Sequence, residues 1–139
     1  MGKVTFERSA EFEGIVRALI DSEQSLAYLH DCRIVCVVSD STKKDEDKRP
    51  MYAECEKVPN KFSWATTADF MITVYSPNIA YFNDGMKQIL MFRELLKIEP
   101  KEDEAGRMQF ELRGYDLKDF RMIVDRFGPD WDKGNTLFD

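Results

Sequence analysis

The chain has 139 residues, the length of one domain with a single hydrophobic core. Hydrophobic residues make up 43% of it and aromatic residues 12%, which excludes a largely disordered protein. Its 20 basic and 26 acidic residues give a net charge of -6. Phosphate contacts need clustered Lys and Arg, so we expect no nucleic-acid partner and no anionic membrane as a partner.

Other features of the composition argue against a secreted or membrane-spanning protein. No run approaches the roughly 20 apolar residues of a membrane helix, and the first residues lack the apolar core of a signal peptide. Three cysteines, an odd number without framework spacing, are typical of reduced thiols. We therefore expect a cytoplasmic protein, in the host cytoplasm if it is phage-encoded. No feature predicts its oligomeric state.

The first half of the chain predicts one helix and three strands. Ser9 is a suitable N-cap, and apolar residues recur after it at helical spacing, so we expect a helix that ends near His30. Residues 41–50 contain no apolar side chain and predict a flexible, solvated loop. Residues 33–38 and 70–75 predict two strands that are apolar on both faces, as in the middle of a sheet. Residues 51–58 alternate between apolar and polar side chains and predict a third strand near an edge.

A second helix is unusual because it is apolar nearly all round. It begins with Asn83 or Asp84 as N-cap, and we expect it to run to about Ile98. A helix with this pattern is buried. Arg93 and Lys97 nevertheless lie on it, four residues apart and hence on one face. Buried charges are costly unless they are paired, so this pair needs an explanation.

The last part of the chain predicts an acidic turn at 101–106, a short strand at 108–112 and a third helix that Asp116 caps and Gly128 ends. Residues 132–139 form an acidic tail. The whole pattern predicts a single α+β domain over residues 1–139, with a core over about 9–131. Three to four strands form a mixed sheet that packs against three helices.

Residues 93–97, Arg-Glu-Leu-Leu-Lys, have the shape of an HExxH zinc motif in which both histidines are replaced. Together with the order of the elements, they resemble the putative phage metallopeptidase family, whose members carry HELLH at this helix. The family's segment RPHD matches Arg-Gly-Tyr-Asp at 113–116, and its closing helix is similar to residues 116–131. The resemblance implies a small zincin-like domain with the motif-bearing helix buried.

The departures from the family motif decide what the resemblance implies about activity. Arg93, Lys97 and Tyr115 stand at the three presumed histidine ligands, and Glu94 alone is kept. Arginine stays protonated and offers a metal no lone pair, and lysine is a ligand only after it loses its proton. Two cations also repel a dication. We therefore expect no zinc at this position, no cofactor and no zinc-dependent hydrolysis.

The remaining metal-ligating residues do not form an alternative site. His30, Cys32 and Cys36 share one strand parity, and Cys55 could lie on a neighbouring strand. On an extended chain, positions 30 and 36 are about 20 Å apart at ~3.3 Å per residue, too far to share one ion. We expect the cysteines to be small core residues and His30 to end the first helix.

Three interpretations of Arg93 and Lys97 are open. They lie on a wetter flank of the helix without a role, or they replace the charge of the metal and bind nearby acids, or they bind an external anion or acidic side chain. Candidate acids within the domain are Glu94, Glu111 and Asp116. The candidate binding site is the former metal site, which consists of Arg93, Glu94, Lys97, Tyr115 and Asp116.

Two functions fit these residues. The first is a catalytically inactive metallopeptidase-like protein that binds a protein partner, for instance as a phage-encoded accessory or anti-defence factor. The alternative is a hydrolase of unrecognised type, in which Glu94 acts with Asp116 or Tyr115 as general acid and base. Loss of all three presumed ligands favours the first.

Overall fold

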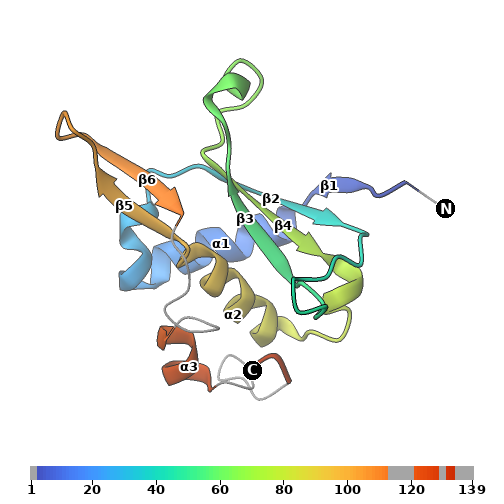
Figure 1. Ribbon diagram of the computed structural model, residues 1–139. Coiled ribbons are helices and arrows are strands. Elements are labelled where there is room, and N and C mark those ends of the chain that lie inside the picture. The colour runs from blue at the N-terminus through green and yellow to red at the C-terminus, as the bar shows by residue number, and fades with distance from the viewer. Residues whose placement is uncertain (1–2, 113–120, 129–130, 134–139) are drawn as a thin grey trace.

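The computed structural model describes residues 3–112, 121–128 and 131–133. This part of the chain has an α+β architecture, in which a four-stranded mixed sheet lies beside a separate two-stranded sheet and the helices (Figure 1). The predicted fold class is confirmed. The predicted N-cap at Asp116 and most of the acidic tail lie outside the described residues.

The main sheet has the strand order β1-β2-β4-β3. Its central strands β2 and β4 are parallel, and each edge strand is antiparallel to its neighbour. The predictions of two inner strands and one edge strand are therefore confirmed for β2, β4 and β3, whereas β1 was not predicted because its three residues are all exposed. The strands are β1 (Phe6–Arg8), β2 (Ile34–Ser39), β3 (Ala53–Lys57) and β4 (Phe70–Tyr75).

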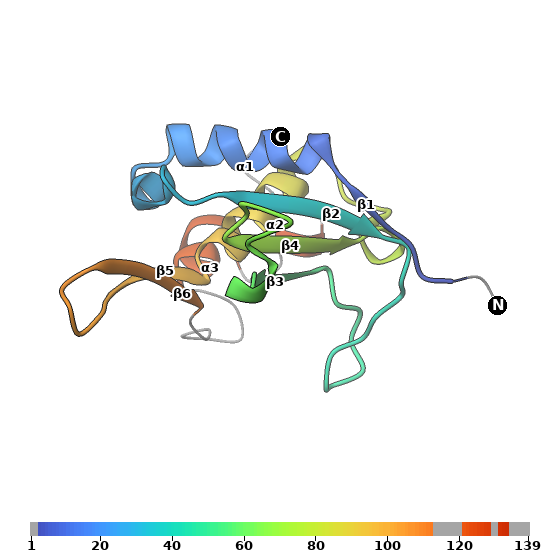
Figure 2. The same ribbon diagram turned by 90° about the horizontal axis from the view of Figure 1, so that it is seen from above.

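One face of the main sheet carries the core. Cys36 of β2 and Cys55 of β3 both lie opposite Ile72 of β4, and all three side chains are buried. Alternation along the strands places every second residue on this face. Helices α1 (Ala10–Ser22) and α2 (Asp84–Leu95) contact each other as well as β2 and β3, respectively. Figure 2 shows α1 lying along one side of the sheet.

The predicted first helix has the expected start and a different end. The Ser9 hydroxyl accepts a hydrogen bond from the Phe12 amide at 3.2 Å, which confirms the N-cap. The helix ends at Ser22, because Glu23 is extended, and a 3-10 helix follows over Gln24–Leu29. The prediction of one helix to His30 is wrong: Leu26 and Leu29, three residues apart, are both buried, and this spacing suits three residues per turn.

Helix α2 is buried as predicted, with Asn83 as its N-cap and a 2.8 Å bond from the Met86 amide. It ends at Leu95, so the predicted end at Ile98 is wrong. Proline disfavours helical conformation in the residue before it. The chain accordingly leaves the helix ahead of Pro100 and forms β5 (Ile98–Glu102), which pairs with the predicted strand β6 (Met108–Leu112).

The end of the described chain packs back on the domain. Helix α3 covers Arg121–Phe127, and Gly128 at φ 85 ends it as predicted. Trp131 begins a short 3-10 helix (Trp131–Lys133) and is buried against the rings of Phe82 and Tyr52, at centroid distances of 6.1 and 6.2 Å. Within the described residues, no helix is long and apolar enough to cross a membrane.

Two turns of the chain have the same construction, although one joins β5 to β6 and the other lies in the loop 41–50. In each, the carboxylate of an aspartate, Asp45 or Asp103, accepts hydrogen bonds from the amides two and four residues later, at 2.8 to 2.9 Å. The fourth residue of each turn has positive φ. It is Gly106 at 79° in the hairpin and Lys48 at 62° in the loop.

Because the two turns match, exchanging these residues should have opposite effects. Lys48→Gly should raise the free energy of unfolding by about 0.5–1 kcal/mol, because a side chain in the left-handed region costs more than the chain entropy of glycine. Gly106→Lys should lower it by about 1 kcal/mol through the same strain. Urea denaturation of both variants measures the effects, and changes of equal sign would contradict the shared construction.

Candidate functional site

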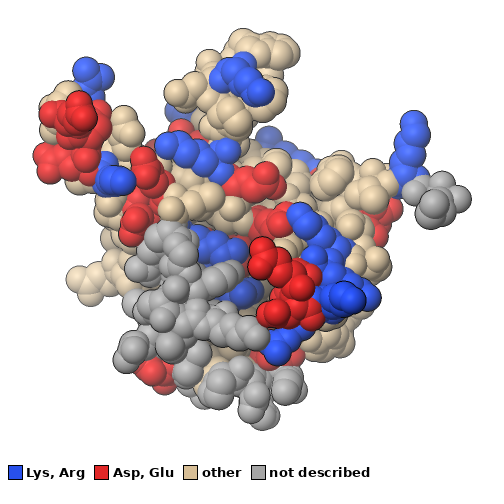
Figure 3. Space-filling model, in the orientation of Figure 1, with Lys and Arg blue, Asp and Glu red and all other residues tan. Residues whose placement is uncertain are grey.

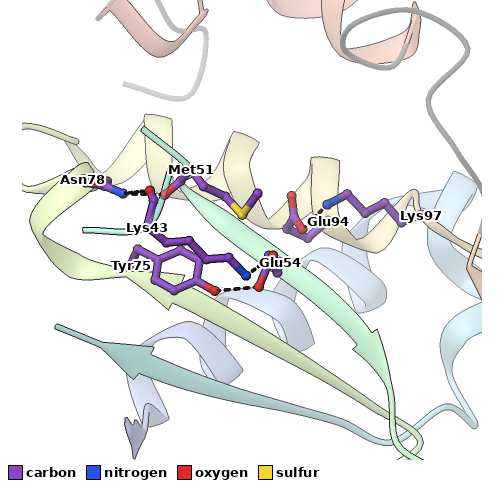
Figure 4. Close-up of polar contacts among 7 residues, drawn as sticks. All are labelled: Lys43, Met51, Glu54, Tyr75, Asn78, Glu94 and Lys97. Carbon is purple, nitrogen blue, oxygen red and sulfur yellow. Dashed lines mark hydrogen bonds and ion pairs between the residues drawn. The ribbon is translucent and has the colours of Figure 1, made fainter. Parts of the chain in front are cut away.

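The centre of the former metal site is the carboxylate of Glu94, near the end of α2. Its side chain is fully buried, with 0% exposed surface. The Lys97 ammonium donates a hydrogen bond to its Oε1 atom at 2.5 Å (Figure 4). An Arg93 guanidinium nitrogen lies 3.7 Å from Oε2. Each cation has only 16% of its side chain exposed. The structure thus places a buried carboxylate against two nearly buried cations.

Lys97 reaches Glu94 from beyond the helix. Leu96 caps α2, and the Lys97 amide donates to the Glu94 carbonyl oxygen at 3.2 Å in a tighter, 3-10-like turn. The prediction that Arg93 and Lys97 share a helix face is therefore wrong for Lys97. They are brought together by the carboxylate between them.

In the described part of the chain, Glu94 is the candidate acid that lies against Arg93. Glu111 instead lies 3.5 Å from Lys101 on the exposed hairpin. Asp116, the other candidate, and Tyr115 lie outside the described residues. The low exposure of both cations and their contact with Glu94 contradict the interpretation of a wet helix flank.

The cysteines lie in the core near this site. All three are free and buried. Burial raises the pKa of Cys32 and of Cys36 to about 12, with smaller contributions from nearby carboxylates. Burial also raises the pKa of the Cys55 thiol, and the negative charge of Glu94 adds to this shift. Protonated, buried thiols of this kind act as small core residues. His30 is exposed, 3.8 Å from Asp21, and ends the 3-10 helix.

The structure also reveals a second carboxylate cluster that the sequence analysis missed. Glu54 of β3 lies on the sheet face opposite Cys55, where it accepts hydrogen bonds from the Tyr75 hydroxyl at 2.6 Å and the Lys43 ammonium at 2.7 Å (Figure 4). Burial alone would raise the pKa of Glu54, but the hydrogen bonds from Lys43 and Tyr75 outweigh it and lower the pKa. The bond from Lys43 ties the loop 41–50 to the sheet.

The signal for this cluster was partly present in the sequence. The alternation of residues 51–58 places Glu54 on the face opposite the core. Its neighbour across the sheet is Thr73, and Tyr75 is the diagonal residue two positions further along β4. The contribution of Lys43 depends on the course of the loop, which the sequence pattern does not define.

The fold and this site together define the class of protein. A mixed sheet with two helices on one face, one of which carries a buried glutamate near its end, is compatible with a small zincin-like domain. The chain belongs to the family described as putative phage metallopeptidase, whose sequence model matches residues 4–138. No curated protein and no solved structure shows significant similarity to it.

The residues at the motif do not fit the zinc ion that this family implies. Arg93 and Lys97 present donor hydrogens to Glu94 where imidazoles would present lone pairs to a metal. Their positive charge already compensates the carboxylate. In the part of the chain that the structure describes, no group of three or more His, Cys, Asp or Glu side chains is arranged to hold a metal ion.

Proposed function

We propose that this member of the family is a catalytically inactive metallopeptidase-like protein that acts by binding a protein partner. A phage-encoded accessory or anti-defence factor in the host cytoplasm is an example of such a role. The absence of catalysis is inferred from the environment of Glu94. Its carboxylate is fully buried and accepts a hydrogen bond from Lys97.

In the zinc motif, the glutamate takes a proton from a metal-bound water, so it needs a free lone pair beside that water. Glu94 instead accepts a hydrogen bond from Lys97 at 2.5 Å and has no solvent-exposed surface. The same burial counts against the alternative of a hydrolase that uses Glu94 with Asp116 or Tyr115, because a general acid or base must reach the substrate. Binding is the function that this fold can perform without the motif.

Peptidase assays on casein-like and short peptide substrates should give no turnover above that of the Glu94→Gln variant, with or without added zinc. Gln keeps the size of Glu and cannot act as a base, so it is the matched control for this position. Hydrolysis by the native protein that Glu94→Gln abolishes would overturn the inactive assignment. Affinity capture from the infected or source cell, compared between the native chain and Glu94→Gln, tests the binding arm: a specific partner should be captured equally by both.

A further inference from the structure

A cleft separates two arms that project from the domain. The loop arm, residues 58–69, connects β3 to β4, and the hairpin arm, residues 98–112, contains β5 and β6 (Figure 1). The cleft has a volume of about 450 Å³ and is lined by Lys57, the loop arm, Phe70 and three consecutive residues of β6, 108–110. None of its lining residues belongs to α2, so it is separate from the site around Glu94.

Within the described residues, β6 pairs with β5 alone, so its other edge, on the side of the cleft, is free of strand pairing there. In an antiparallel pair, hydrogen-bonded and non-hydrogen-bonded residue pairs alternate. The bond from the Asp103 amide to the Arg107 carbonyl at 2.9 Å makes these two residues a hydrogen-bonded pair. Met108 and Phe110 then occupy positions that are not hydrogen-bonded to β5, so their amides and carbonyls point away from it. Pro100, which has no amide hydrogen, lies opposite Phe110, as this alternation requires.

Exposed apolar side chains gather on the two arms. Of seven large hydrophobic residues that are exposed in the described chain, four lie here. Trp64 and Phe62 on the loop arm have 84% and 43% of their surface exposed, and Met108 on the hairpin has 64%. The other member is Leu112. Aromatic residues and methionine are enriched in protein interfaces, so the arms have the composition of a contact surface.

Two lysines lie on the loop-arm side of the cleft, although the lining itself contains one lysine and one aspartate. Lys57 lines it and Lys61 lies on the loop arm, and neither forms an ion pair with a described residue. The three lining residues of β6 are uncharged. Asp69, the one acid in the lining, accepts a hydrogen bond from the Arg33 amide at 2.9 Å. Figure 3 shows basic side chains on the loop arm and acidic ones at the hairpin tip.

We infer that this cleft binds an extended, acidic segment of a partner protein, which adds a strand to the free edge of β6. Its backbone pairs with Met108 and Phe110, its alternate apolar side chains pack against Trp64 and Phe62, and its acids lie near Lys57 and Lys61. The acids of the hairpin tip keep the segment towards Lys57. This inference rests on the proposed binding function and specifies its partner, even though the net charge of -6 taken alone would favour a basic one.

The probe is a short fluorescent peptide in which Val and Leu alternate with Glu, and its matched control carries Lys in place of Glu. Fluorescence anisotropy should show the acidic peptide binding about tenfold more tightly than the basic one, because two exposed ion pairs together contribute about that factor. Affinity should fall as salt rises. In a labelled protein, amide exchange at Met108 and Phe110 should slow when the peptide binds.

Two variants separate the charge and backbone contributions. Lys57→Glu with Lys61→Glu should reverse the preference between the two peptides, whereas Lys3→Glu with Arg17→Glu, an equal charge change on exposed residues elsewhere, should leave it unchanged. Met108→Pro removes one outward amide without breaking a bond to β5, and should weaken binding of both peptides with the fold kept in circular dichroism.

The inference is overturned if neither peptide binds, if both bind equally and the charge reversal has no effect, or if the protected amides lie on another surface. Concentration-dependent self-association that competes with the peptide would assign the cleft to a second copy of the chain instead. Mass spectrometry of the same samples reports any cleavage of the peptides. Cleavage would refute the inactive assignment without bearing on the cleft, and absence of binding would refute the cleft without bearing on inactivity.

Discussion

Replacing Lys97 with alanine should lower the free energy of unfolding by about 3–5 kcal/mol, because it leaves the charge of a buried carboxylate without its nearest compensation. Glu94 has no exposed side-chain surface, and the Lys97 ammonium is 2.5 Å from its Oε1 atom. Water cannot replace the lost donor without opening the core around α2. Urea denaturation, with the linear extrapolation of the unfolding free energy to water, gives the difference directly.

The matched control is Lys87, a lysine within α2. Lys87 Nζ lies 3.2 Å from a carboxylate oxygen of Glu11, whose side chain is 58% exposed. A pair of this kind is worth about 0–1 kcal/mol, so Lys87→Ala should have a small effect. Arg93→Ala should fall between the two, since its guanidinium is further from Glu94, at 3.7 Å. If Lys97→Ala lowers the free energy of unfolding no more than Lys87→Ala does, Lys97 does not compensate the charge of Glu94.

The elements that local chemistry specifies could be predicted from the sequence. Ser9 and Asn83 begin their helices as expected because each side chain accepts a bond from an amide three residues on. Strand β4 matches the predicted residues, since a short run that is apolar on both faces fits a central strand. In these cases a few neighbouring residues carry the whole signal.

The strands that the sequence did not predict are those whose pairing partners are distant in the chain or lack a clear hydrophobic pattern. The edge strand β1 is short and fully exposed, so it has no hydrophobic pattern, and its position depends on pairing with β2 more than 25 residues later. Strand β5 begins at Ile98, where the apolar pattern of α2 still continues and where the sequence predicts the end of that helix. Its extended form is stabilised by β6, and local propensity does not report that pairing.

One part of the candidate site, the need for an acid beside Arg93 and Lys97, could be inferred from the sequence. Two cations in an apolar stretch of chain need a nearby carboxylate, and Glu94, which contacts both, is one of the three acids that the sequence offers. The exact path was not predictable, because Lys97 lies beyond the end of α2 and reaches the carboxylate through a tightened turn. Glu54 was missed because its partners come from β4 and from a loop without periodicity.

Restoring histidine at the three motif positions, with Arg93→His, Lys97→His and Tyr115→His in one chain, should create a zinc site of about one ion per protein. The two cations that now compensate Glu94 would be absent, so the variant should be less stable than the native chain without metal. Zinc should restore stability, because a ligand that binds the folded state stabilises it by RT ln(1 + [L]/Kd), about 2.7 kcal/mol at one hundred times Kd.

The matched control carries Asn at the same three positions, which removes the same charges and supplies no imidazole. It should lose as much stability and recover none of it with zinc. Elemental analysis after gel filtration and thermal unfolding with and without zinc measure both effects. Adding Glu94→Gln to the histidine variant should leave zinc binding intact, because the motif glutamate acts on the bound water and is not a ligand. Recovery by zinc in the histidine variant alone would show that the former metal site survives in this fold, with two of its ligands exchanged for cations and one for tyrosine. Equal behaviour of the two variants would refute the alignment of these three positions with the family motif.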